Sequence, residues 1–135
     1  MTKSLVHYLR RSVNQRPDAE AVVHRGRRVS YGQLWRDVCA LSSFLKERGL
    51  GQEDRVAILL ENSPEYIAAY YGTLMAGGVA VALNNATKAR DLVNWLAHSG
   101  ANWLIADALH PELDEVLRSA HPKLQLISVG GNGSV

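Results

Sequence analysis

Hydrophobic residues recur along this chain in two different patterns. Up to about residue 48 they return every three or four positions in two stretches, which is the spacing of amphipathic helices. From Arg55 onward, short uninterrupted apolar runs alternate with helical patterns. The patterns therefore predict two parts: residues 1–54 form a helix, a hairpin and a second helix, and in residues 55–135 strands and helices alternate.

The first stretch predicts an amphipathic helix followed by a hairpin. Leu5, Leu9 and Val13 are four residues apart and share one helical face, and Pro17 limits the end of the helix. Two short β-type segments then flank Gly26, which favours the left-handed backbone of a tight turn. The chain is therefore expected to reverse its direction at Gly26 before the second helix begins.

The second helix carries its own start and stop signals. The hydroxyl of Ser30 can accept a hydrogen bond from a backbone amide of the first turn, and Gln33 completes the pattern of a capping box. Gly49 is typical of the residue that follows a helix in the left-handed conformation. This helix is expected over residues 31–48. Its buried face consists of Leu34, Val38, Leu41 and Leu45.

Four apolar runs after residue 55 predict four strands. Each run is apolar on both faces, and each gap between two runs contains a helical pattern, which is typical of parallel strands covered on both sides by helices. The fold class is therefore α/β, with a doubly wound, Rossmann-like parallel sheet and crossover helices. The four runs cover residues 56–60, 79–83, 103–106 and 124–129.

The three crossover helices have recognisable starts. In the first, the capping residue Ser63 precedes Pro64 at the first helical position. The glycines of segment 72–77 indicate a close approach between this helix and the sheet. The second helix is expected over residues 89–98, and the third begins at Pro111 with acidic residues in its first turns. The third helix is expected to bury Leu113, Val116 and Leu117.

Composition limits the class of protein. Of the 135 residues 47% are hydrophobic and 21% charged, as in one globular domain rather than a disordered, collagen-like or disulfide-rich chain. The single cysteine, Cys39, favours a reducing compartment, and charged residues interrupt the opening segment where a secretory signal is apolar, so we expect a cytoplasmic protein. The longest uncharged run, 66–87, predicts a buried helix and strand rather than a membrane span.

The charged residues are unevenly distributed. Residues 1–36 contain eight basic and two acidic residues, whereas the remainder contains seven basic and eleven acidic residues. Such a basic segment attracts anions such as nucleic acid or a phosphorylated cofactor. It is equally typical of a solvated helix face and hairpin tip. No aromatic residues alternate with the arginines, so we favour solvated charges and do not expect a nucleic-acid partner.

Polar residues follow three of the predicted strands, where an open parallel sheet binds its ligands. They also suit the capping of strand-to-helix turns, and both interpretations stay open. The three segments are Glu61-Asn62, Asn84-Asn85 and Asp107.

The sequence contains none of several common catalytic patterns. The turn after the strand at 56–60 contains no glycine, unlike a dinucleotide-binding turn, and segment 72–78 lacks the Lys and Ser/Thr of a phosphate loop. The five histidines are not at metal-ligand spacing, and no serine lies in a Gly-x-Ser-x-Gly elbow. The sequence therefore assigns no catalytic residue and no metal ligand.

Several short segments, taken in order, resemble the start of the adenylate-forming (AMP-binding) superfamily, which includes acyl-CoA synthetases, luciferases and the adenylation domains of peptide synthetases. The resemblance extends from about Leu5 to Val129. The segments that carry it are Pro17-Asp18 with Ala21-Val22, Val29 to Leu34, Gly49, Asp54 to Ile58, Asn62 to Glu65, Ala76 to Asn84, and Ser99 to Ala101.

This resemblance implies the N-terminal segment of a larger AMP-binding domain. Members of the family activate a carboxylic acid with ATP and Mg²⁺, and transfer the acyl group to a thiol of CoA or of a carrier protein. The family's phosphate loop and catalytic lysine have no counterpart here and are expected beyond Val135. The segment alone is therefore expected to be inactive, to bind no cofactor itself, and to have the rest of its own ligase chain as its partner.

One position departs from the family pattern. Many relatives carry Pro and then Arg where this chain has Asn85 and Ala86, and in some CoA ligases that arginine meets the phosphates of CoA. The resemblance leaves Lys88 and Arg90 as candidates for this role. The alternative interpretation is that both are simply solvated charges at the start of a helix.

Two further readings remain beside the ligase fragment. The first is a free-standing small α/β regulatory or interaction module, such as a receiver-like domain, and the second is a catalytically inactive relative that serves as a binding protein. A sheet cut from a larger domain also exposes apolar surface, so self-association is expected. A candidate surface is the helix that carries Tyr66, Tyr70 and Tyr71, which are equally interpreted as core residues.

Overall fold

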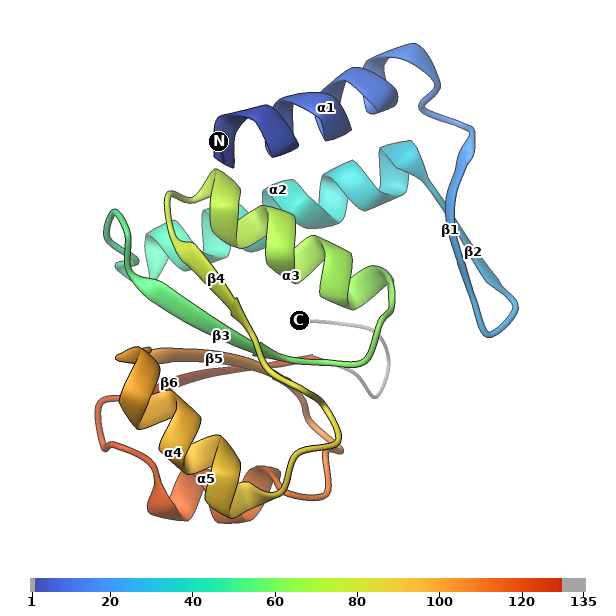
Figure 1. Ribbon diagram of the computed structural model, residues 1–135. Coiled ribbons are helices and arrows are strands. Elements are labelled where there is room, and N and C mark those ends of the chain that lie inside the picture. Colours follow the sequence, from blue (N-terminus) through green and yellow to red (C-terminus); the bar gives the residue numbers. More distant parts are fainter. Residues whose placement is uncertain (1, 130–135) are drawn as a thin grey trace.

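The computed structural model describes residues 2–129, and the side chain of Leu5 and the end of the predicted part 55–135 lie outside what it describes (Figure 1). The elements follow the predicted order. They are α1 (Thr2–Gln15), β1 (Glu20–His24), β2 (Arg27–Ser30), α2 (Tyr31–Glu47), β3 (Arg55–Leu59), α3 (Pro64–Met75), β4 (Val79–Ala82), α4 (Ala89–Ser99), β5 (Trp103–Asp107), α5 (Leu113–Ser119) and β6 (Gln125–Val129).

The four predicted strands form one parallel sheet in the order β4-β3-β5-β6. Helices α2 and α3 cover one face and α4 and α5 the other (Figure 1). Along β3, Val56 and Ile58 point into the core under α2 and α3, whereas Ala57 and Leu59 point into the core under α4 and α5. The prediction of a doubly covered α/β sheet is confirmed, because each central strand is buried on both faces.

The predicted hairpin is confirmed as β1 and β2, which pair antiparallel apart from the main sheet. Its two turn residues, Arg25 and Gly26, have φ angles of 52° and 80°. Two successive residues with positive φ are typical of the tight turns that match the twist of paired strands. The hairpin leads directly into α2 at Ser30.

Helix α2 begins with a local cap, as predicted, but the capping box is only half formed. The Ser30 Oγ accepts a hydrogen bond from the Gln33 amide N at 3.1 Å. The prediction that the Gln33 side chain bonds back to the start of the helix was wrong. Gln33 Nε2 donates to Asp37 Oδ1, and Gln33 Oε1 accepts from Arg36. These neighbours are one turn along the helix and compete for the amide group.

Helix α3 is also capped by its own sequence, since Ser63 Oγ accepts from the Tyr66 amide at 3.1 Å and Pro64 opens the helix. The interpretation of its first glycine was wrong. A Cβ atom at Gly72 would lie 3.1 Å from the Leu41 side chain, so this glycine allows a close approach between α3 and α2 rather than between α3 and the sheet. The small residue lets two helices, not a helix and a strand, share the core.

The helices on the opposite face agree less well with prediction. Helix α4 and its left-handed end at Gly100 (φ 71°) are as expected. Helix α5 begins at Leu113 rather than Pro111, and Leu117, which was expected to be buried, is 39% exposed. A helix of seven residues presents only one narrow stripe to the sheet, and Leu113 and Val116 fill it.

Two features of the α1–α3 layer complete the fold. Tyr66 and Tyr70 stack with 6.4 Å between their ring centroids. Both are partly buried against the core, so they are neither fully exposed surface residues nor fully buried core residues. Cys39 of α2 is half-buried, and burial raises the pKa of its thiol above the usual value, while the charge of Arg10 on α1 acts in the opposite direction.

Among residues 2–129, none of the helices has the length and apolar character needed to cross a membrane.

Candidate functional site

The carboxyl end of β3 is occupied by contacts with the hairpin. Arg25 Nη2 lies 2.8 Å from Glu61 Oε2, and His24 Nε2 lies 3.7 Å from the other oxygen of the same carboxylate. The backbone carbonyl of Glu61 accepts a hydrogen bond from Ser63 Oγ at 2.9 Å. Glu61 therefore anchors the hairpin tip in this structure.

The basic residues of the hairpin are paired rather than available for a polyanion. Arg27 donates to both oxygens of Glu65 in the first turn of α3, at 2.6 and 2.8 Å, and Arg28 donates to Glu20 at 2.8 Å. The three arginine side chains remain between 48% and 77% exposed. Two of the three arginine pairs join the hairpin to acidic residues that follow β3, and the third lies within the hairpin, which agrees with a solvated hairpin tip.

The loop after β4 is bonded to itself and to the neighbouring loop. Asn84 Oδ1 accepts from the Ala86 amide at 2.9 Å, and the Asn84 carbonyl accepts from the Thr87 amide at 3.0 Å. The Asn85 carbonyl oxygen lies 2.7 Å from His110 Nε2. The side-chain oxygen of Asn85 is buried and has no hydrogen-bond partner within residues 2–129. Asn84 acts as a turn residue here, as the capping interpretation expected.

The loop after β5 contains two residues that the sequence did not identify as site residues. Asp107 Oδ1 accepts from the Leu109 amide at 2.8 Å, which is again a local turn. His110, 9% exposed, faces Asn85, and Glu112 Oε1 accepts from the Ala89 amide at 3.0 Å. The sequence shows His110 only as one of five histidines that are not at metal-ligand spacing, because nothing local marks a partner 25 residues away.

Lys88 and Arg90 lie where α4 begins, beyond the carboxyl end of β4. Both side chains are exposed, and within residues 2–129 neither forms an ion pair. Lys88 is the residue that precedes the first helical turn, and its side chain does not cap the helix. Both cations are therefore accessible to a ligand at this edge of the sheet.

The side chains described in residues 2–129 do not assemble a metal site. No group of three or more histidine, cysteine or acidic residues in that range could hold a metal ion. Four of the acidic and amide side chains at the carboxyl ends already accept hydrogen bonds, from Arg25, Ala86, Leu109 and Ala89, whereas the buried side-chain oxygen of Asn85 does not. These residues therefore do not form a metal-binding cage of their own.

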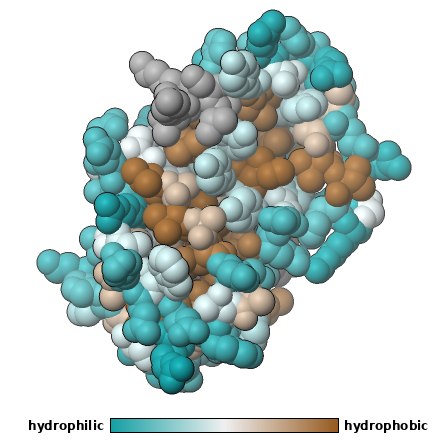
Figure 2. Space-filling view, in the orientation of Figure 1, coloured by the Kyte–Doolittle hydropathy of each residue, from teal (hydrophilic) through white to brown (hydrophobic). Residues whose placement is uncertain are grey.

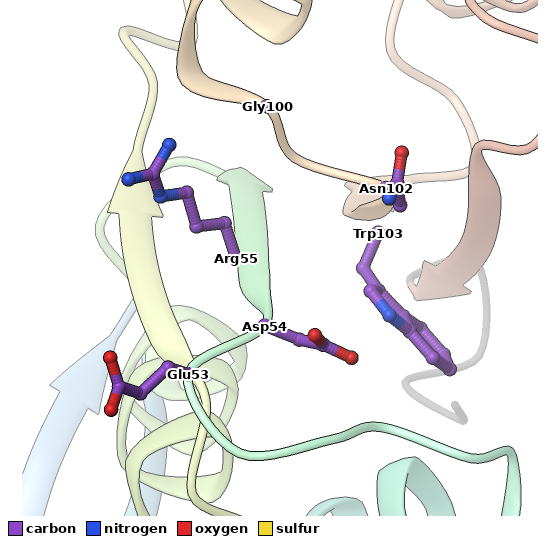
Figure 3. A pocket seen from close by; sticks show the side chains of 6 residues that line it. All are labelled: Glu53, Asp54, Arg55, Gly100, Asn102 and Trp103. Carbon is purple, nitrogen blue, oxygen red and sulfur yellow. The ribbon is translucent and has the colours of Figure 1, made fainter.

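A depression of about 220 Å³ lies at the opposite, amino edge of the sheet, where β3 and β5 begin (Figure 3). One guanidinium nitrogen of Arg55 donates to the carbonyl of Ser99, so its charge is engaged beside the depression. The depression is shared by acidic and basic groups and is far from the carboxyl ends. Its lining residues are Glu53, Asp54, Arg55, Gly100, Asn102 and Trp103.

The outer edge of β4 is apolar and open. Val79 and Leu83 donate to β3, at Asp54 and Ile58, so in a parallel ladder the backbone groups of Ala80 and Ala82 point away from the sheet. No other strand within residues 2–129 pairs with them. Figure 2 shows hydrophobic side chains gathered in the middle of the face on which β4 runs.

Comparison with known proteins agrees with the sequence resemblance. The pattern of the family described as "AMP-binding enzyme" matches residues 9–132. The chain is similar to 4-hydroxybutyrate–CoA ligase 2 of Metallosphaera sedula, with 29% identity over 110 residues, which are 82% of this chain and 20% of that ligase. It is also similar to the long-chain-fatty-acid–CoA ligase of Bacillus subtilis, with 37% identity over 82 residues, 61% of this chain and 15% of that ligase.

A structural comparison gives the same result. A crystal structure of a benzoate CoA ligase from Burkholderia xenovorans has a TM-score of 0.85 and 27% sequence identity with this chain. The similarity covers 95% of this chain and 26% of that protein. The chain spans at most about a fifth of the length of the two curated relatives named above.

Proposed function

The chain belongs to the AMP-binding enzyme family, and from this premise we propose that it is the N-terminal part of an ATP-dependent acyl-CoA ligase. Such a ligase activates a carboxylic acid as an acyl adenylate with release of pyrophosphate, and then transfers the acyl group to the thiol of CoA with release of AMP. Residues 1–54 and 55–135 together form the first part of its N-terminal domain. We place it in the cytoplasm, where ATP and CoA are both available.

The observation that carries this proposal is the family match over residues 9–132 together with the similarity of the fold to a benzoate CoA ligase. CoA is the proposed acceptor because both curated relatives described above are CoA ligases. Residues 2–129 assemble no metal-binding group of side chains, and the family's phosphate loop and catalytic lysine have no counterpart in the sequence, so ATP and Mg²⁺ are proposed to bind to other parts of the ligase. The role of this chain is then to build the sheet and to present its carboxyl edge.

The test compares two proteins in an assay of acid-dependent exchange between ATP and pyrophosphate. The 135-residue chain is expected to give no exchange above background and to bind ATP weakly by calorimetry. The whole product of the same reading frame is expected to give exchange with at least one of benzoate, 4-hydroxybutyrate and a long-chain fatty acid, and to form the CoA thioester. A reading frame that ends at codon 135 would contradict the proposal and favour a free-standing module.

Lys88 and Arg90 are proposed to contact the phosphates of CoA. Their exposure, their freedom from ion pairs within residues 2–129 and their position at the carboxyl edge support this role. In the whole ligase, the double variant Lys88→Ala/Arg90→Ala should raise KM for CoA and leave the exchange between ATP and pyrophosphate unchanged. Arg118→Ala, an exposed cation on α5, is the matched control. Equal KM values for CoA in both variants would exclude the assignment.

The open edge of β4 is proposed to pack against the rest of the ligase. In the 135-residue chain alone a second copy takes that place, because Ala80 and Ala82 leave unpaired backbone groups on an apolar strand. Val79, at the start of this edge, is 41% exposed. Light scattering of the 135-residue chain should therefore detect association that increases with concentration. A monodisperse monomer at high micromolar concentration would contradict it.

A further inference from the structure

Two loops at the carboxyl edge are joined although their strands do not pair. The loop after β4 and the loop after β5 come from strands that β3 separates in the sheet. They meet through two hydrogen bonds. His110 Nε2 lies 2.7 Å from the carbonyl oxygen of Asn85, and Glu112 Oε1 accepts from the Ala89 amide at 3.0 Å. The segment from Asn85 to Ala89 is thus held at both ends by the same neighbouring loop.

The partners of the His110 ring determine where its proton lies. The Asn85 carbonyl can only accept a hydrogen bond, so Nε2 must donate. The Glu112 amide can only donate, and it lies 3.1 Å from Nδ1, so Nδ1 must accept. A neutral ring with its proton on Nε2 satisfies both bonds, whereas the other neutral tautomer satisfies neither. The geometry therefore assigns one tautomer to a histidine that is 9% exposed.

Glu112 completes the connection at the start of α4. Lys88, the residue before this helix, does not cap it with its side chain. The Glu112 carboxylate accepts from the first helical amide instead, and a negative charge at a helix N-terminus is favourable. Because the backbone of Glu112 is itself bonded to His110, the ring supports both ends of the segment.

We propose that His110 is a positioning residue, whose Nε2–H fixes the segment from Asn85 to Ala89 and thereby orients Lys88 and Arg90 toward the phosphates of CoA. The CoA role rests on the proposed function, whereas the link between the loops does not. An exposed lysine on a free loop, and an arginine in the first turn of a helix whose start is not fixed, would each sample many positions. A segment fixed at both ends restricts them before the ligand binds, which lowers the entropy lost on binding.

Two substitutions separate the two bonds of the ring. In His110→Gln, the side-chain amide can still donate to Asn85 from the position of Nε2. In His110→Asn, the shorter side chain can still accept from the Glu112 amide in place of Nδ1, but it no longer reaches Asn85. His121→Asn is the control, because His121 Nδ1 accepts from the Lys123 amide at 3.0 Å in the same local arrangement on an exposed turn.

Amide hydrogen exchange of the 135-residue chain reads out the link. His110→Asn should accelerate exchange at Ala86, Thr87 and Ala89 by about fivefold, as expected for one lost hydrogen bond, whereas His110→Gln and His121→Asn should stay within about twofold of the unmodified chain. If His110→Asn kept the slow exchange of these amides and His110→Gln did not, the ring would act only through its bond to the Glu112 amide, and the proposal would be overturned. If neither variant folds, nitrogen NMR of the unmodified ring decides: a proton on Nδ1 overturns the proposal and one on Nε2 supports it.

The whole ligase tests the positioning role separately. His110→Asn should raise KM for CoA about fivefold without changing the rate of adenylate formation, and His110→Gln should restore KM. An unchanged KM for CoA in a ligase whose loop amides do exchange faster would exclude the positioning of Lys88 and Arg90. A protein without ligase activity would contradict the proposed function, while the exchange data would still decide the link between the loops.

Discussion

The two faces of the sheet are covered by helices that are held in different ways. On one face, α2 and α3 are 17 and 12 residues long, and each begins with a serine that caps its own first turn. On the other face, α4 and α5 are 11 and 7 residues long, and neither has a side-chain cap of its own at the N-cap position. The first amide of α4 depends on Glu112, 23 residues away.

This difference separates local from long-range encoding of structure. Ser30 and Ser63 cap amides three residues away, so the starts of α2 and α3 are encoded in their own local sequence. The start of α4 is complete only when the loops after β4 and β5 have met. The face that carries the proposed CoA contacts is therefore the face that depends on long-range contacts, as functional loops often do.

The largest effect is expected in the core, where the two faces should be equal. Leu41→Ala on the buried face of α2 and Leu92→Ala on the buried face of α4 should each lower the free energy of unfolding by about 2–5 kcal/mol, because both substitutions leave cavities in the core. Leu117→Ala, at an exposed position, should change it by less than about 0.5 kcal/mol. Denaturant titration measures all three. A small effect of Leu92→Ala alone would show that the α4 face is loosely packed.

A local cap should give an intermediate effect. Ser30→Ala removes the acceptor of the Gln33 amide and should lower the free energy of unfolding by about 1 kcal/mol. Ser30→Asp, which keeps an acceptor at the same place, should restore most of the stability. The same denaturant titration applies. A loss greater than that of Leu41→Ala would contradict the placement of this helix.

The long-range cap should give an effect of similar size to the local cap, and a local cap should be able to replace it. Glu112→Ala should lower the free energy of unfolding by about 0.5–1.5 kcal/mol through the lost bond to the Ala89 amide. Lys88 has the extended backbone of a capping residue (φ −79°, ψ 159°), so Lys88→Ser supplies a local acceptor. In the Lys88→Ser background, Glu112→Ala should have a smaller effect. Equal effects in both backgrounds would show that Glu112 does not act as a cap.

The exposed ion pairs of the hairpin should have the smallest effect. Arg27→Ala removes the pair with Glu65 and should lower the free energy of unfolding by at most about 1 kcal/mol. The difference between the variant and the unmodified chain should shrink as salt is added, because salt screens exposed charges. Chemical denaturation in urea at low and high salt tests this. A difference that does not change with salt would indicate that Arg27 acts through packing.

The sequence predicted the elements whose signals lie within a few residues. The strands, the turn at Gly26, the caps at Ser30 and Ser63 and the end of α4 at Gly100 are all of this kind. The errors concern choices between partners in three dimensions. Gln33 bonds along its helix rather than back to its start, and Gly72 faces a helix rather than the sheet.

The candidate site was predictable only in part for the same reason. The polar residues at the carboxyl ends follow from the strand pattern, but the pairing of Glu61 with the hairpin and of His110 with Asn85 joins segments 25 or more residues apart. Neither histidine spacing nor hydrophobic period carries information about such contacts. The role of Glu112 was likewise hidden, because an acidic residue before a helix is first assigned to that helix.

The half-buried thiol of Cys39 offers a chemical measurement of whether the first helix stays packed on α2. Alkylating reagents react with the thiolate, and burial keeps the pKa of Cys39 above its usual value, so the fraction of thiolate is lower than in an exposed cysteine. If α1 separates from α2, the charge of Arg10, which lowers this pKa, moves away from Cys39, and we expect the rate of alkylation to change. The rate of alkylation at the single cysteine is therefore expected to report the opening of the amino-terminal helix, without any added label.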